Sequence, residues 1–303
     1  MAYRVPGGEV MVDIDLIRRA LAEDLAGGTD ITSVATVSGN ENVVADFTAR
    51  KSGVIAGIEM AMATLREVGL TDISQHLKDG DRVEAGAVLL TVRGDTRAIL
   101  LAERTALNFL GHLGGIATLT NRWVQEVAGT KTLIRDTRKT TPGMRLLEKA
   151  AVVAGGGSNH RLSLSDAALI KDNHIAAAGG VVQAFSKVRS AFPDAFIEIE
   201  VDSISQLEEV AAQSPDLVLL DNMSPEECAR AVAFVAGRFK LEASGGITLE
   251  NARAYAETGV DYLAIGALTH SAPVLDIGLD LRLETRTEKY CYSLSMSEIQ
   301  IPS

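Results

Sequence analysis

Cysteine is scarce in this sequence, and long apolar runs are missing. Only two cysteines occur among 303 residues, and Cys228 and Cys291 stand far apart, in no spacing typical of metal ligands. A disulfide framework is therefore not expected, and the composition suits a reducing cytosol. No apolar stretch approaches the roughly 18 residues of a membrane span, and the N-terminus lacks the basic flank and apolar core of a signal peptide. We expect a cytoplasmic protein with no membrane partner.

Positive charge is in the minority over the whole chain but not in one segment. The sequence has 29 lysines and arginines against 40 aspartates and glutamates, a net charge of −11, which argues against nucleic acid as a partner. Between Arg135 and His174, however, basic residues outnumber acidic ones, and they stand where apolar runs end. This local excess predicts a pocket for a small anion that carries several charges.

Short apolar runs alternate with helical stretches over the second half of the chain. The runs cover residues 132–137, 167–173, 196–202, 217–222, 241–246 and 262–268, with a less regular one before His160. Strands that alternate with helices predict parallel βαβ units, and seven of them favour a closed or nearly closed α/β barrel of the TIM type. The alternative is an open doubly wound sheet, which the lack of a GxGxxG motif after the first strand disfavours.

The first part of the chain has a different pattern. The sequence predicts an amphipathic helix near residues 14–25 and strands of an antiparallel or mixed sheet at 43–51, 53–58 and 79–92. A helical stretch follows at 96–128, which Gly111, Gly114 and Gly115 are expected to break.

Three regions follow from these patterns. We predict an N-terminal α/β domain over residues 1–114, with linking helices to about 130, and a barrel domain over 115–281. Residues 282–303 do not continue the barrel pattern and form a tail whose role the sequence leaves open.

Polar and small residues follow the predicted barrel strands. In an α/β barrel the carboxyl ends of all strands face one mouth, so these residues become neighbours. The last two strands end on Ser244-Gly245-Gly246 and Ile265-Gly266-Ala267, whose backbone N–H groups can approach a phosphate closely. Glu200 and Asp221 are candidate oxygen ligands of a divalent metal, or groups that stabilise a developing positive charge.

The basic strand ends allow more than one chemistry. Arg138, His160 and Arg161 are candidates for binding carboxylates, which arginine contacts through two donors at once. Lys171 is either a Schiff-base nucleophile, as in aldolases, or a partner of a phosphate or carboxylate. A barrel that binds phosphate without catalysis is a third class of function. We interpret His270, which stands just past a strand end, as structural.

Seven motifs in sequence order resemble the quinolinate phosphoribosyltransferase family, and the likeness runs from about residue 12 to residue 281. The motifs are DTRKTTPG (136–143), GGGSNHRL (155–162), LIKDNHI (169–175), EIEVD (198–202), LLDNM (219–223), EASGGI (242–247) and ETGVDYLAIGALTHSAPVLDIGLD (257–280). Any one of them would be modest evidence, but seven in order are highly specific.

The resemblance implies a reaction and an architecture. Phosphoribosyl would pass from 5-phosphoribosyl-1-pyrophosphate to quinolinate with decarboxylation, giving nicotinate mononucleotide, CO2 and pyrophosphate, with Mg²⁺, on the de novo path to NAD. The implied fold is an N-terminal α/β sandwich domain plus a C-terminal seven-stranded α/β barrel. The implied assembly is a homodimer in which the partner chain completes each site.

The resemblance also implies roles for individual residues. Arg138, His160 and Arg161 would hold the two carboxylates of quinolinate, and Arg104 would reach that pocket from the other subunit. The remaining assignments are Lys139 and Lys171 for phosphates or a substrate carboxylate, Glu200 and Asp221 for the ribose and the metal, Ser244 to Gly246 with Ile265 to Ala267 for the 5′-phosphate, and Thr137 for substrate binding. The catalytic residues would be Lys139, Lys171, Glu200 and Asp221. The nearest alternative is a related phosphoribosyltransferase that takes another heteroaromatic acid.

Overall fold

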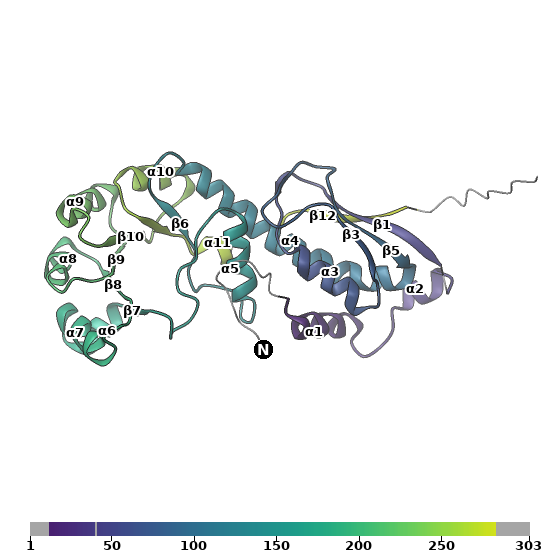
Figure 1. The fold of residues 1–303 in the computed structure, drawn as a ribbon, viewed down its shortest axis with the longest axis horizontal. Coiled ribbons are helices and arrows are strands. Elements are labelled where there is room, and N and C mark those ends of the chain that lie inside the picture. The colour runs from purple at the N-terminus through teal and green to yellow at the C-terminus, as the bar shows by residue number, and fades with distance from the viewer. Residues whose placement is uncertain (1–11, 40, 283–303) are drawn as a thin grey trace, which may run out of the picture.

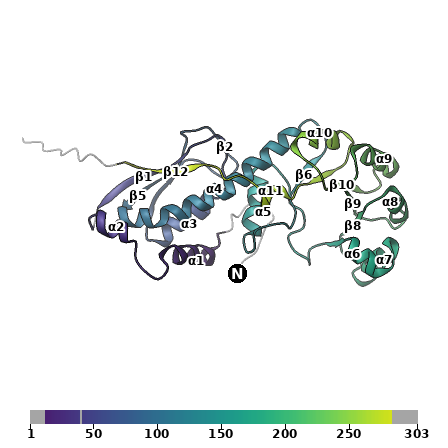
Figure 2. The same ribbon diagram turned by 180° about the vertical axis from the view of Figure 1, so that it is seen from behind.

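The computed structural model describes residues 12–39 and 41–282. Two bodies stand side by side, and the helix α4 (Thr96–Glu126) runs from one into the other (Figure 1). The view from behind shows the same helix crossing between them (Figure 2). Within the described residues, no helix combines the length and the apolar character needed to cross a bilayer.

The N-terminal body is an antiparallel sheet with helices packed against it. Its sheet has the order β12-β1-β5-β3, and a separate pair is formed by β2 and β4. Val43, Ala45 and Phe47 alternate along β1 and share one buried apolar cluster with residues of α3 and α4, so one face of the strand lies on a core. The other face is covered as well, because every residue from Val43 to Ala49 is buried. The elements are α1 (Ile14–Leu25), α2 (Ile31–Thr36), β1 (Asn42–Ala49), β2 (Gly53–Val54), α3 (Ile58–Glu67), β3 (Asp72–Gln75), β4 (Arg82–Val83), β5 (Val88–Asp95) and β12 (Ile277–Arg282).

The strand β12 comes from the far end of the sequence. It pairs antiparallel with β1, with Ile277 opposite Ala49 and Arg282 opposite Val44. The range predicted for the barrel domain, 115–281, therefore includes residues of a strand that belongs to the other sheet. The predicted tail over 282–303 lies outside the described residues except for Arg282, which ends this strand.

Helix α4 is continuous over 31 residues, so the prediction that three glycines break it is wrong. These glycines instead let the segment 273–275 cross the helix closely. A Cβ on Gly115 would lie 2.2 Å from the carbonyl oxygen of Pro273, and one on Gly111 would lie 3.1 Å from that of Leu275. The Leu275 N–H donates to the Gly111 carbonyl at 2.9 Å. Close packing here outweighs the helix-propensity cost of glycine, which is about 1 kcal/mol per residue.

The C-terminal body is a parallel sheet with helices around its outside (Figure 1). The strand order is β6-β11-β10-β9-β8-β7, as expected for βαβ units. The strands are β6 (Leu133–Arg135), β7 (Ala168–Ile170), β8 (Ile197–Val201), β9 (Leu217–Asp221), β10 (Lys240–Ser244) and β11 (Tyr262–Ala264). The helices are α5 (Arg145–Ala154), α6 (Asp172–Ala178), α7 (Val181–Ala191), α8 (Ile204–Ala211), α9 (Pro225–Val235), α10 (Leu249–Glu257) and α11 (Ala267–His270).

The seventh predicted strand, before His160, is reduced to one bridge. Ser158 pairs in parallel with Arg135 of β6, and its N–H donates to the Ile134 carbonyl at 2.8 Å. The chain then leaves the sheet, because the His160 N–H donates to the side chain of Asp136 at 2.9 Å. Six strands and this bridge therefore form the barrel wall, and β6 and β7 are the ends of the hydrogen-bonded order.

Candidate active site

A cavity of about 620 Å³ opens at the carboxyl ends of the barrel strands. It is lined by every residue that the sequence analysis placed in the site except Arg104: Thr137, Arg138, Lys139, His160, Arg161, Lys171, Glu200, Asp221, Ser244, Gly245, Gly246, Ile265, Gly266 and Ala267. Residues spread over 131 positions of sequence thus meet because parallel strands present their carboxyl ends to one mouth. Asp202, which also follows β8, is not among the lining residues.

One wall of the cavity is cationic and has unused donors. The Nε atoms of Arg138 and Arg161 are buried and have no hydrogen-bond acceptor among the residues that the structure describes, although Arg161 Nη1 donates to the Ala167 carbonyl at 2.8 Å. Burial lowers the pKa of Arg161, and the nearby charge of Arg138 lowers it further. Two partly buried guanidinium groups that repel each other favour an anion that both can contact.

A second wall of the cavity carries two carboxylates. Lys171 Nζ lies 2.7 Å from Glu200 Oε2, and Asn222 Nδ2 donates to Asp221 Oδ2 at 2.7 Å. Burial raises the pKa of Asp221, and the charge of Glu200 raises it further. The two acids therefore repel each other, which favours a cation between or near them. The ion pair of Lys171 and its 48% exposed side chain do not provide the apolar surroundings that activate a Schiff-base lysine.

The third part of the cavity requires glycine. Gly245 has φ +87°, and a Cβ there would lie 2.2 Å from Asn222 Oδ1. A Cβ on Gly266 would lie 3.0 Å from Lys139 Cδ and 3.2 Å from His270 Nε2. The absence of side chains at these positions leaves backbone N–H groups accessible to a ligand. His270, interpreted as structural from the sequence, lines this part of the cavity.

A charged network that the sequence analysis missed lies beneath the cationic wall. His160 Nε2 contacts Glu198 Oε2 at 2.8 Å and Glu242 Oε1 at 3.4 Å. Glu242 also accepts from Arg135 Nη1 at 2.8 Å, and that guanidinium stacks 4.3 Å above the centre of the Tyr262 ring. The sequence did contain a signal for these two glutamates. Side chains two residues apart share one face of a strand, so Glu198 faces inward with Glu200, and Glu242 faces inward with Ser244.

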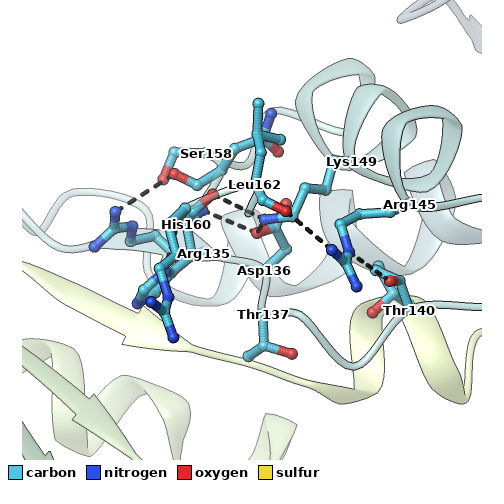
Figure 3. Close-up of polar contacts among 12 residues, drawn as sticks. Arg135, Asp136, Thr137, Thr140, Arg145, Lys149, Ser158, His160 and Leu162 are labelled. Atoms are coloured by element: carbon cyan, nitrogen blue, oxygen red, sulfur yellow. Dashed lines mark hydrogen bonds and ion pairs between the residues drawn. The ribbon is translucent and has the colours of Figure 1, made fainter. Parts of the chain in front are cut away.

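Side chains of helix α5 contact the loops of the cationic wall, and Figure 3 shows Lys149 and Arg145 extending from this helix toward Asp136, Thr140 and Leu162. The ammonium group of Lys149 is 1% exposed; it bonds to Asp136 and donates to the His160 carbonyl at 2.8 Å. Arg145, one turn earlier on the same helix, donates from Nε to Thr140 Oγ1 at 3.1 Å and from Nη1 to the Leu162 carbonyl at 3.1 Å. One helix therefore fixes both segments that carry Arg138 and Arg161.

Arg104 lies apart from this cavity. It projects from α4 with 64% of its side chain exposed and lines a second hollow of about 550 Å³, together with Asn108 and His112 of the same helix. That hollow also includes Thr141 and Met144, which follow the loop of Arg138. Within one chain, Arg104 is therefore not a lining residue of the cavity at the strand ends.

Both family models and individual relatives match this sequence. The family model "Quinolinate phosphoribosyl transferase, N-terminal domain" matches residues 30–114, and the model of the C-terminal domain of the same family matches residues 116–280. A relative from Mycobacterium leprae, named nicotinate-nucleotide pyrophosphorylase [carboxylating], is 53% identical and the match covers 88% of this chain and 96% of the relative. A probable enzyme of the same name from Bacillus subtilis is 40% identical, over 91% of this chain and 96% of the relative.

Solved structures agree with the sequence matches. A nicotinate-nucleotide pyrophosphorylase from Ehrlichia chaffeensis has a TM-score of 0.84 at 41% identity, and the match covers 88% of this chain and 98% of that one. An enzyme of this name from Francisella tularensis has a TM-score of 0.86 at 38% identity, over 90% and 98% of the two chains. The combination of an α/β N-terminal body and an α/β barrel is thus shared along nearly the full length.

Proposed function

The chain belongs to the quinolinate phosphoribosyltransferase family, and we infer that it is the decarboxylating enzyme of NAD biosynthesis that this family name describes. The reaction joins quinolinate to the phosphoribosyl group of 5-phosphoribosyl-1-pyrophosphate and releases pyrophosphate and CO2. The observation that carries this inference is a single cavity with cationic, acidic and glycine-rich walls, because the two substrates together carry carboxylates, a pyrophosphate and a phosphate.

Each wall suits one part of the reaction. We propose that Arg138 and Arg161 bind the carboxylates of quinolinate, and that the backbone at Ser244–Gly246 and Ile265–Ala267 binds the 5′-phosphate. Loss of pyrophosphate leaves a cationic ribosyl carbon, which Glu200 and Asp221 would stabilise, while Lys139 and Lys171 neutralise the departing anion. Thr137 lines the cavity beside them.

The ring nitrogen of quinolinate then attacks the ribosyl carbon. Once this nitrogen carries the ribose, the ring becomes an electron sink, and the carboxylate beside it can leave as CO2. This sequence needs no covalent enzyme intermediate, so the contribution of the protein is alignment and electrostatic stabilisation.

Mg²⁺ is the cofactor that we propose. Glu200 and Asp221 supply the oxygen ligands that this cation prefers, and the raised pKa of Asp221, caused by burial and by the charge of Glu200, indicates a repulsion that a cation would relieve. When bound, Mg²⁺ supplies charge neutralisation for the pyrophosphate. We also place the reaction in the cytoplasm, which the small number of cysteines suits.

Release of CO2 is the direct test of the reaction. With quinolinate labelled in the carboxyl group next to the ring nitrogen, we expect labelled CO2 only when 5-phosphoribosyl-1-pyrophosphate and Mg²⁺ are both present. Nicotinate serves as the competing substrate. Formation of the nucleotide from nicotinate but not from quinolinate would assign the enzyme to a different heteroaromatic acid.

We further propose that the active enzyme is a homodimer in which Arg104 enters the cavity of the partner chain. This proposal rests on the resemblance to the family, and it is supported by the exposure of Arg104 and by its position outside the cavity of its own chain. A symmetric dimer would give each site one such arginine. The positive charge would add to Arg138 and Arg161 around the dianionic substrate.

Mixed dimers test the role of Arg104. Arg104→Ala and Arg161→Ala should each lower kcat/KM roughly 100-fold through the loss of charge-assisted hydrogen bonds. When the two variants are unfolded together and refolded, about a quarter of the wild-type activity should return, because half of the dimers are mixed and each has one intact site. A mixture no more active than its components would place Arg104 in the site of its own chain or outside both sites.

A further inference from the structure

Both ring nitrogens of His160 already have partners inside the protein. The Arg161 N–H donates to Nδ1 at 2.7 Å, and Nε2 lies 2.8 Å from a carboxylate oxygen of Glu198. The side chain of His160 is only 7% exposed. The ring therefore lines the cavity without a free nitrogen to offer to a substrate carboxylate.

These contacts select one tautomer of the ring. Nδ1 must keep its lone pair to accept from the Arg161 N–H, so the ring proton must be on Nε2, where it faces Glu198 and Glu242. Burial lowers the pKa of His160, but the hydrogen bonds and charges of Glu198 and Glu242 outweigh burial and raise the pKa to about 9. The Arg161 N–H opposes that rise, because protonation of Nδ1 would bring two hydrogens together over 2.7 Å.

The same tautomer argues against a metal at this point. His160, Glu198 and Glu242 place one ligand atom each within 4.8 Å of one another, and the second carboxylate oxygen of Glu198 has no hydrogen-bond partner within residues 12–39 and 41–282. A metal at Nε2 would need the lone pair on that nitrogen and would move the proton to Nδ1. There it would collide with the Arg161 N–H.

Both acidic groups are buried, and Glu242 has a second basic partner. Glu242 is fully buried and is paired with Arg135 at 2.8 Å, whose guanidinium stacks on Tyr262. Glu198 is 2% exposed and lies on β8, two residues before Glu200. The two glutamates thus form a buried acceptor surface next to Nε2 of His160, and Nδ1 of the same ring accepts from the backbone N–H of Arg161.

We propose that Glu198 and Glu242 are positioning residues, which hold His160 as the neutral Nε2–H tautomer so that its Nδ1 fixes the backbone of Arg161 for binding the substrate carboxylate. In this arrangement His160 acts on Arg161 and does not bind the substrate itself. The inference rests on the proposed function only for the identity of the bound acid, quinolinate.

Nitrogen NMR on the enzyme with ¹⁵N-labelled histidine tests the tautomer directly. His160 is assigned as the signal that His160→Gln removes from the spectrum. We expect a protonated Nε2 and an unprotonated Nδ1 at neutral pH, and the same pattern when quinolinate saturates the site. An imidazolium, or a change of protonation pattern on binding, would overturn the proposal. This measurement holds even if quinolinate proves not to be the substrate.

Calorimetric binding separates positioning from simple electrostatics. In Glu198→Leu, the Nε2–H group loses this acceptor, so quinolinate should bind about tenfold more weakly, with less than about a twofold change for 5-phosphoribosyl-1-pyrophosphate. An electrostatic role predicts the opposite, because removal of an anion near Arg161 would tighten the binding of a dianion. Unchanged or tighter binding of quinolinate by Glu198→Leu would refute the proposal. Glu198→Gln keeps an amide oxygen that can accept from Nε2–H, so it should bind quinolinate as the wild type does. Glu227→Gln, in the capping box of α9, is the control expected to match the wild type.

Discussion

Replacement of Lys149 by methionine is expected to lower the free energy of unfolding by about 3–5 kcal/mol, the range for removing one partner of a buried ion pair. The reason is that Asp136 has no exposed surface and would keep an uncompensated charge. Burial already raises the pKa of Asp136, against the opposing charge of Lys149. Urea unfolding followed by circular dichroism measures this loss.

A double variant separates the buried charge from the position of the loops. Lys149→Met with Asp136→Asn removes both charges and leaves an amide oxygen to accept from the His160 N–H, so it should recover most of the lost stability. Activity should stay low, because the His160 carbonyl loses the donor that holds it. Full recovery of kcat/KM in the double variant would show that Lys149 does not position the Arg161 segment. No recovery of stability would refute the account of the buried charge.

Loss of either acid of the cavity should reduce turnover sharply. Glu200→Gln and Asp221→Asn are each expected to lower kcat by about 10²–10³, the usual effect of removing a group that stabilises charge in a transition state. Quinolinate should still bind, because the arginines face it from the other wall. Single-turnover measurement of CO2 release, with binding of quinolinate measured separately, distinguishes the two effects.

The neighbouring acid provides a matched control. Asp202 also follows β8 but is exposed and is not a lining residue of the cavity, so Asp202→Asn should leave kcat unchanged. If Glu200→Gln and Asp221→Asn changed only the affinity for ligands and left kcat intact, the barrel would be a binding module instead of a catalyst. An equal effect of all three substitutions would indicate a general dependence on negative charge.

Much of the barrel could be predicted from local sequence, because strands and helices there are short and differ in periodicity. The exceptions are positions where contacts between distant segments decide the structure. Gly115 has the sequence signal of a break, but its role depends on Pro273, 158 positions away. The strand expected before His160 is only a bridge, because the backbone N–H of His160 donates to the buried carboxylate of Asp136 and is not available to a neighbouring strand.

In the site, too, residues at strand ends could be predicted from the local sequence, whereas residues whose partners lie far away in the sequence could not. Polar residues at strand ends could be grouped into one mouth because the geometry of parallel barrels requires it. Glu198 and Glu242 stand inside apolar strands, and nothing in their neighbours indicates that His160 and Arg135 compensate them. Arg104 looks like an ordinary exposed arginine on a helix, and only the resemblance to a family gave it a role.

The return of β12 to the first sheet affects how the protein can fold during synthesis. The edge next to β1 is filled by residues 277–282, so that strand lacks its neighbour until most of the polypeptide has left the ribosome. A fragment cut at residue 114 would expose the N–H and C=O groups along that edge, which is a template for aggregation. The N-terminal and C-terminal bodies are therefore distinct in shape but completed together, by the last strand of the described chain.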